Sequence, residues 1–132
     1  MRDQNMNRIF FDSSAWIEYF AGTARGQKIK QLLKPETKVF TTGMIVAEVI
    51  AKHLKEGLQT ENAMQALRAI PFLVTFESKI GEETAKIYVQ QRKVKQKFGL
   101  VDAHVVATAR AVNAQIITCD LDFSGLSDVK LI

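Results

Sequence analysis

Four acidic residues adjoin strongly apolar segments of this sequence: Asp12, Glu48, Asp102 and Asp120. A carboxylate held against apolar surface needs a cation or several hydrogen bonds, because desolvating the charge alone costs several kcal/mol. If the four carboxylates gather in one place they repel one another, and hard divalent cations such as Mg²⁺ or Mn²⁺ relieve that repulsion. Such a cation can activate a bound water and stabilise charge on a phosphodiester. These residues therefore suggest metal-assisted hydrolysis of nucleic acid.

Two of the acids directly follow predicted strands. Asp12 comes after residues 9–11, a continuously apolar run that is typical of a strand buried on both faces of a parallel sheet. Asp120 follows residues 115–119 in the same way, with Asp122 just beyond it. If these strands are neighbours in a parallel sheet, both carboxylates emerge at the edge where open α/β folds bind ligands.

Asp12 also has a purely structural alternative. Ser13 or Ser14 can N-cap the helix that follows, whose apolar stripe contains Trp16, Ile17 and Phe20. In that interpretation Asp12 only helps to cap the helix. This stretch alone leaves the two interpretations open.

The other two acids fall within predicted helices. Glu48 is the only charged residue in the segment 44–51, although an amphipathic helix whose polar edge includes Glu48 would give the same pattern. Asp102 shares a helix side with apolar residues and lies in the first turn, where the helix dipole alone favours an acid by roughly 0.3–1 kcal/mol. The four acids together are therefore a stronger indication than any one of them.

The whole chain has the composition of a soluble globular protein. Its 132 residues, 47% apolar and 24% charged, suit a single domain covering residues 1–132. No segment has the apolar length of a membrane span. The polar residues 1–7 precede an apolar run too short for a secretory signal, so we expect a cytoplasmic location.

The cysteine and histidine content argues against zinc. Cys119 is the only cysteine, which excludes an internal disulfide and a cysteine-based zinc site within one chain. His53 and His104 lie far apart without a second ligand at suitable spacing, so we interpret them as ordinary helical histidines. The net charge of +4 is compatible with a polyanionic partner but decides little alone.

Strands alternate with helices along the chain. We predict strands over residues 9–11, 38–41, 72–76, 115–119 and 129–132. After the first helix, residues 22–26 are predicted as a loop, and further helices are predicted over residues 27–34, 43–56, 60–69, 78–97 and 101–112. This alternation favours an α/β layered fold with a mainly parallel sheet.

With these segments in place, the sequence resembles the PIN-domain family, specifically the small VapC-type toxin ribonucleases of toxin–antitoxin pairs. The resemblance covers essentially the whole chain and rests on Phe11–Ser14, on Glu48 within an apolar helix, on Leu100–Ala103 and on Thr118–Phe123. It implies a three-layer α/β/α sandwich with a central, mainly parallel sheet. It also implies an acidic metal site that cuts RNA.

The resemblance further implies a set of site residues and partners. The catalytic and metal-binding acids would be Asp12, Glu48, Asp102 and Asp120, with Asp122 as a possible fifth ligand of Mg²⁺ or Mn²⁺. Ser13 and Thr118 match hydroxyl positions that the family uses to orient water or carboxylates, although ordinary cap and strand-end hydroxyls would look the same. The family also implies a homodimer and an antitoxin protein that covers the site.

A basic segment precedes Asp102 in the sequence and is a candidate RNA contact. Its cations are Arg92, Lys93, Lys95 and Lys97. They can hold RNA phosphates near the acids. The alternative is a solvated helix end whose cations complement the helix dipole.

The leading hypothesis is a Mg²⁺- or Mn²⁺-dependent endoribonuclease. A non-catalytic PIN-like RNA-binding or interaction module is the first alternative, but its sequence sign would be the loss of acids, and all four are present. A flavodoxin-like phosphoacceptor signalling domain is the second. Such a domain requires an adjacent acid pair after its first strand and a lysine at the end of a later strand. Here Asp12 is followed by two serines, and no lysine ends the predicted strand 115–119.

Overall fold

Five parallel strands form one sheet in the order β3-β2-β1-β4-β5. The structure, a computed structural model, describes residues 7–132, so residues 1–6 of the polar leader lie outside the described residues. The strands are β1 (Arg8–Phe11), β2 (Lys38–Thr41), β3 (Phe72–Leu73), β4 (Gln115–Thr118) and β5 (Val129–Leu131).

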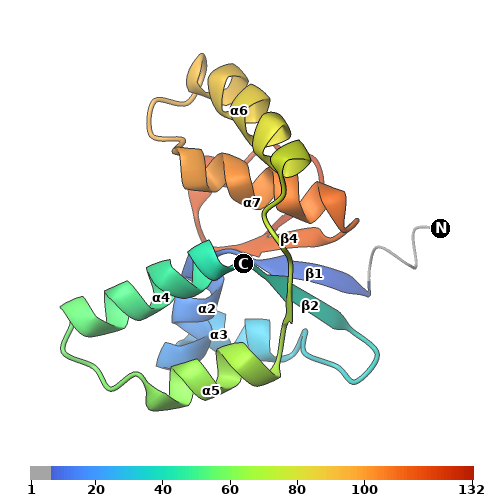
Figure 1. Cartoon of the computed structure of the whole chain (residues 1–132). Helices are drawn as coiled ribbons and strands as arrows, with labels where there is room; N and C mark the ends of the chain where they lie inside the picture. The colour runs from blue at the N-terminus through green and yellow to red at the C-terminus, as the bar shows by residue number, and fades with distance from the viewer. Residues whose placement is uncertain (1–6) are drawn as a thin grey trace.

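Helices cover both faces of this sheet (Figure 1). On one face lie α2 (Ser13–Ala21), α3 (Ala24–Lys30), α4 (Gly43–Lys55) and α5 (Glu61–Ala69), and on the other lie α6 (Ser78–Arg92) and α7 (Leu100–Ala111). A short 3₁₀ turn, η1 (Leu121–Phe123), joins β4 to β5. The predicted three-layer α/β/α sandwich with a parallel sheet is confirmed. Within residues 7–132, no helix combines the length and apolar character needed to cross a bilayer.

The central position of β1 follows from its sequence. Phe10 and Phe11 are completely buried, because β1 has a neighbouring strand on each side and helices over each face. Phe10 is in register with Phe40 of β2 and with Ile116 of β4. The predicted placement of this strand in the middle of the sheet, next to the strand that precedes Asp120, is confirmed.

The direction in which the sheet is built reverses between β1 and β4. From β1 the chain adds β2 and then β3 on one side, and afterwards returns to add β4 and β5 on the other. The connections after the carboxyl ends of β1 and β4 therefore diverge to opposite faces and leave a crevice between them, the position where open α/β sheets bind ligands. Asp12 lies at this edge, and its backbone N–H donates to the carbonyl of Ile117 at 3.2 Å.

Two predicted elements are shorter in the structure. The strand predicted over residues 72–76 has only two residues in the structure, because β3 is an edge strand that pairs with β2 alone. The N–H of Val74 still donates to the carbonyl of Thr41 at 2.8 Å, and the chain then turns towards α6. The predicted helix 78–97 ends at Arg92, and Val94, expected to face inward, is 78% exposed. The N–H groups of Lys93 and Val94 donate to the carbonyls three residues earlier, which tightens the chain after α6.

The second helix begins earlier than predicted. Residues 22–26 were expected to form a loop, but α3 starts at Ala24, N-capped by Thr23, whose hydroxyl accepts from Gly26 N–H at 3.0 Å. Gly26 packs directly against the backbone of α2. A β-carbon added there would lie 2.0 Å from the carbonyl oxygen of Glu18. The missing side chain therefore allows the two helices to approach closely.

We expect Gly26→Ala to lower the free energy of unfolding by about 1–3 kcal/mol, because the helices must separate to admit the methyl group. Gly43→Ala is the matched control, since an added β-carbon meets nothing within 4 Å at the start of α4. That change should be neutral or stabilising by up to about 1 kcal/mol. Urea unfolding of the three proteins measures both effects. Equal stability of Gly26→Ala and wild type would contradict the close packing of α2 on α3.

Candidate active site

Asp12 is the N-cap of α2. Its backbone is extended, and its Oδ1 accepts from the N–H of Ala15 at 2.9 Å. The expectation that Ser13 or Ser14 caps this helix is therefore wrong, because the helix begins one residue earlier than that cap would allow. The capping interpretation of Asp12 is correct, but its carboxylate makes further contacts that a helix cap does not require.

Two hydroxyl groups complete the environment of the Asp12 carboxylate. The Ser14 hydroxyl donates to Oδ1 at 2.7 Å, and the Thr118 hydroxyl at the end of β4 donates to Oδ2 at 2.5 Å. Each hydroxyl also accepts a backbone N–H, Ser14 from Cys119 at 3.0 Å and Thr118 from Asp120 at 2.9 Å. A continuous hydrogen-bond network therefore joins the ends of β1 and β4.

The serine hydroxyl that contacts Asp12 is that of Ser14. The resemblance to the family implied Ser13 as a supporting hydroxyl, and its role in orienting water stays a prediction. Helical side chains are directed back towards the helix N-terminus, so a first-turn serine two residues after the cap can reach the capping carboxylate. Thr118 does contact Asp12, in the supporting position predicted for its hydroxyl.

Burial controls the protonation of Asp12. The residue is only 4% exposed. Desolvation raises the pKa of its carboxyl from the usual 3.8 to about 6, although the hydrogen bonds from Thr118, Ser14 and Ala15 oppose this increase. The nearby charge of Asp120 adds a smaller increase. The side chain is thus a buried carboxylate whose charged form needs additional stabilisation.

Asp102 is the point where the other acids meet. It lies half-buried in the first turn of α7, and its Oδ2 accepts from Gly99 N–H at 2.7 Å. Burial raises the pKa of the Asp102 carboxyl, the hydrogen bond from Gly99 opposes this, and the charges of Asp120, Glu48 and Asp122 raise it further. The segment that follows β4 and the helices α4 and α7 therefore bring acids into electrostatic range of Asp102.

Asp120 connects the two parts of this acidic group, because its charge acts on both Asp12 and Asp102. It also caps η1, since its Oδ1 accepts from the N–H of Asp122 at 2.8 Å. Glu48 contributes from the middle of α4, where it is half-buried. We use the name acidic crevice for Asp12, Glu48, Asp102, Asp120 and Asp122 at the carboxyl edge of β1 and β4.

A buried histidine helps to place the two helices of this crevice. His104 of α7 and the hydroxyl of Thr42, the N-cap of α4, lie 2.8 Å apart. Burial lowers the pKa of His104, which favours the neutral ring. This contact joins the helix that carries Glu48 to the helix that carries Asp102. The sequence pattern indicated only an ordinary helical histidine, and nothing in it identified Thr42 as the partner.

No acid of the acidic crevice forms an ion pair within residues 7–132. The ion pairs found there are Lys52–Glu56 and Lys86–Glu83, and both lie on exposed helix surfaces. Over the same residues, no three Asp, Glu, His or Cys side chains form a group that can hold a metal ion as they stand. The donor set nevertheless fits Mg²⁺ or Mn²⁺, because it consists of carboxylate oxygens whose charges raise the pKa of Asp12 and Asp102 beyond the effect of burial.

The basic segment is only partly available to a substrate. The Lys95 ammonium donates to the backbone carbonyl of Asp122 at 2.7 Å and to that of Ser124. Lys95 is thus half-buried and engaged within the protein, and its predicted role as a phosphate contact stays a prediction. Arg92 donates to the Tyr88 hydroxyl at 3.1 Å and covers its ring. Lys93 and Lys97 are exposed and remain candidates for phosphate contact.

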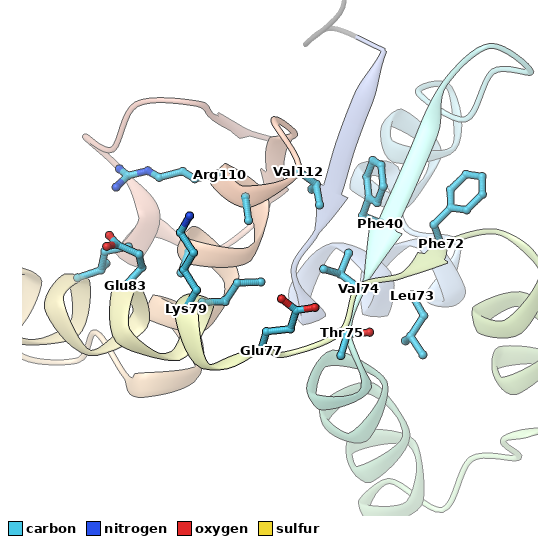
Figure 2. Close-up of a pocket in the computed structure, with 14 residues that line it drawn as sticks. Phe40, Phe72, Leu73, Val74, Thr75, Glu77, Lys79, Glu83, Arg110 and Val112 are labelled. Carbon is cyan, nitrogen blue, oxygen red and sulfur yellow. The ribbon is translucent and has the colours of Figure 1, made fainter.

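A separate apolar groove of about 720 Å³ lies between β2, β3, α6 and α7 (Figure 2). Its apolar end contains Phe40, Phe72 and Leu73, and Lys79, Glu83 and Arg110 lie towards the other end. None of the acids of the acidic crevice lines it. The groove and the acidic crevice are therefore two different surfaces.

The family profile of the PIN domain matches residues 9–129. The chain belongs to the PIN-domain family. The match begins within β1, ends within β5 and spans every element between them, so the fold and the family assignment agree. No curated protein matches the chain significantly.

Three solved structures of toxin–antitoxin proteins resemble this PIN domain. A toxin–antitoxin complex from Klebsiella pneumoniae has 21% identity and a TM-score of 0.70, with 92% of this chain and 95% of that chain covered. Mycobacterium tuberculosis VapC20, described as a sarcin-ricin-loop-cleaving toxin, has 26% identity and a TM-score of 0.69, covering 92% and 98%. VapBC2 from Rickettsia felis, bound to a promoter DNA fragment, has 13% identity and a TM-score of 0.72, covering 95% and 97%.

The raised pKa of Asp12 predicts how stability changes with pH. The Asp12 carboxyl has a pKa of about 6 in the folded protein and of 3.8 in the unfolded chain. The stability that this residue contributes is therefore present at low pH and is lost as the pH rises through 6. The shift of about two pKa units corresponds to about 3 kcal/mol. Asp12→Asn should therefore raise the free energy of unfolding by up to that amount at pH 8 and by little near pH 4.

Urea unfolding in the presence of EDTA measures this difference between wild type and variant at each pH. Asp128→Asn, a change of the same kind at an exposed residue, is the reference. If the difference in unfolding free energy between wild type and Asp12→Asn is the same at pH 4 and pH 8, Asp12 is not a desolvated carboxylate.

Proposed function

We propose that this PIN domain is a Mg²⁺- or Mn²⁺-dependent endoribonuclease and the toxin of a toxin–antitoxin pair. The observation that carries the proposal is the convergence of acids on Asp102. Burial raises the pKa of the Asp102 carboxyl, the charges of Asp120, Glu48 and Asp122 raise it further, and none of these carboxylates forms an ion pair within the described residues. Charged groups with perturbed pKa values that face a ligand crevice are typical of catalytic sites. They lie at the switch point of the sheet, where such a crevice is expected.

The proposed metal ligands are Asp12, Glu48, Asp102 and Asp120, with Asp122 as a possible fifth. A divalent ion bound there supplies an activated water and stabilises negative charge on the phosphodiester. The protein holds the acids in place through the Thr118 and Ser14 hydroxyls on Asp12 and the Gly99 N–H on Asp102. The burial of Asp12 limits the number of competing waters around that carboxylate.

RNA is the proposed substrate, and the cytoplasm, where RNA is plentiful, is the proposed compartment. The similarity to VapC20, a toxin described as cleaving the sarcin-ricin loop, supports RNA rather than another phosphodiester. The exposed Lys93 and Lys97 lie in the segment that contacts η1 and are suited to hold phosphates beside the acids. The similarity to toxin–antitoxin complexes supports an antitoxin as protein partner, with a basic side chain that reaches the acids.

A second copy of this chain is the proposed occupant of the apolar groove. The edge strand β3 exposes 57% of Phe72 and 70% of Leu73, which is unfavourable in water unless another surface covers them. The groove is also lined by two acidic residues, Glu77 and Glu83, and by two basic residues, Lys79 and Arg110. A two-fold axis brings such a mixed surface against itself with opposite charges in contact.

We expect Asp12→Asn and Asp102→Asn each to abolish cleavage of a defined RNA panel while the circular dichroism spectrum stays that of wild type. Each change removes one charge from the acidic crevice and keeps the shape of the side chain. EDTA should abolish wild-type cleavage, and Mg²⁺ or Mn²⁺ should restore it. Asp128→Asn serves as the control and should remain active. Cleavage retained by both acid variants and in EDTA would reject the proposed mechanism.

We expect Leu73→Lys to convert a dimer into a monomer, because a charge would be buried at the centre of the proposed contact. Size-exclusion chromatography with light scattering measures the mass in solution. Leu54→Lys, at a residue on α4 that is 65% exposed, is the control and should leave the mass unchanged. A Leu73→Lys protein that remains dimeric, or a monomeric wild type, would exclude this surface as the dimer contact.

A further inference from the structure

The segment that connects α6 to α7, residues 93–99, contacts the turn η1 at two points. Lys95 donates to the backbone carbonyls of Asp122 and Ser124. Phe98 and Phe123 are both buried and pack edge to face, with ring centroids 6.0 Å apart. One contact is polar and the other apolar, so they fix both the distance and the orientation of η1 relative to this segment.

The same segment also controls Asp102. Gly99 is the N-cap of α7, and its N–H donates to Asp102 at 2.7 Å. Residues 93–99 therefore touch η1, which follows Asp120 and contains Asp122, and also hold the carboxylate of Asp102. The acids from two separate parts of the chain are set against one another through this one connection.

The contacts of Lys95 are unusual for an ammonium group near acids. Both hydrogen bonds that its ammonium donates within residues 7–132 go to backbone carbonyls, and neither ion pair found in these residues includes it. The carbonyls of Asp122 and Ser124 belong to the turn that the Asp120 carboxylate closes by accepting from Asp122 N–H at 2.8 Å. By binding these carbonyls, Lys95 restrains the backbone of η1, and it thereby restrains the orientation of the Asp120 carboxylate that caps η1.

We infer that Lys95 is a positioning residue that holds the Asp120–Asp122 turn against the start of α7 and thereby sets the acidic crevice for its metal ion. The inference rests on the proposed function for the identity of the ligand. The contact with η1 is independent of it. Lys95 acts through the carbonyls of the turn and does not contact RNA.

Three variants test this role. Lys95→Met keeps an unbranched side chain and removes every hydrogen-bond donor, whereas Lys95→Arg keeps donors for the two carbonyls. Lys97→Met is the matched control for hydrogen exchange and for Mn²⁺ binding, because it removes the same charge from an exposed position of the same segment. Thermal unfolding of all three confirms that the proteins compared are folded.

Amide hydrogen exchange measures the turn directly. The N–H groups of Asp122, Phe123 and Ser124 donate to Asp120 Oδ1, Asp120 O and Leu121 O at 2.8, 3.2 and 3.0 Å. We expect these three amides to exchange faster in Lys95→Met than in wild type and Lys97→Met, with Lys95→Arg between them. Equal exchange in Lys95→Met and Lys97→Met would overturn the inference, whether or not the protein is a nuclease.

Titration with Mn²⁺ alone measures the consequence for the acids. Loss of a group that orients metal ligands weakens metal binding about 10–100-fold, so Lys95→Met should bind Mn²⁺ at least about tenfold more weakly than wild type. Its KM for RNA should be unchanged, and its kcat should recover at high Mn²⁺. A raised KM with unchanged Mn²⁺ affinity would instead show a phosphate contact and overturn the inference. A wild type that neither binds Mn²⁺ nor cleaves RNA would refute the proposed function, and hydrogen exchange would still decide whether Lys95 holds the turn.

Discussion

The buried carboxylate of Asp12 is the interaction on which the rest of the site depends. Its charge is removed from water, and three donors from two different elements compensate for that loss: the hydroxyl of Ser14 and the N–H of Ala15 on α2, and the hydroxyl of Thr118 on β4. These bonds exist only when β1 and β4 are neighbours and α2 starts at Asp12. The chain therefore cannot satisfy Asp12 without also assembling the carboxyl edge of the sheet.

The remaining acids make this edge electrostatically unfavourable on its own. The charges of Asp120 and of the acids around Asp102 raise the pKa values of Asp12 and Asp102, so part of the folding free energy is spent on keeping like charges together. A protein selected only for stability would replace such groups by apolar residues of similar size. A divalent ion reverses the sign of this interaction, because each carboxylate then faces a positive charge. The same arrangement that is costly without an ion is favourable with one.

The topology separates this charged surface from the apolar groove. The crevice lies at the carboxyl ends of β1 and β4, in the centre of the sheet, whereas the groove lies beside the edge strand β3. The two surfaces differ in composition, one being acidic and the other apolar with charges of both signs at its margin (Figure 2). The two surfaces do not share lining residues.

The sequence by itself determined the elements whose signals are local. The apolar runs before Asp12 and Asp120 gave β1 and β4, and the run at residues 38–41 gave β2 with its observed bounds. The helices predicted over residues 43–56 and 60–69 match α4 and α5 to within one residue at each end, because strand burial and helix termination depend on nearby residues. The acids were identified as a group for the same reason, since each is conspicuous against its apolar neighbours. Only the tertiary structure decided which side chains meet. It gave the Asp12 contact to Ser14, joined His104 to Thr42, ended the third strand after two residues and directed Lys95 to the carbonyls of η1. These outcomes depend on strand order and helix placement, which bring together residues far apart in the chain and leave no periodic signal in the sequence.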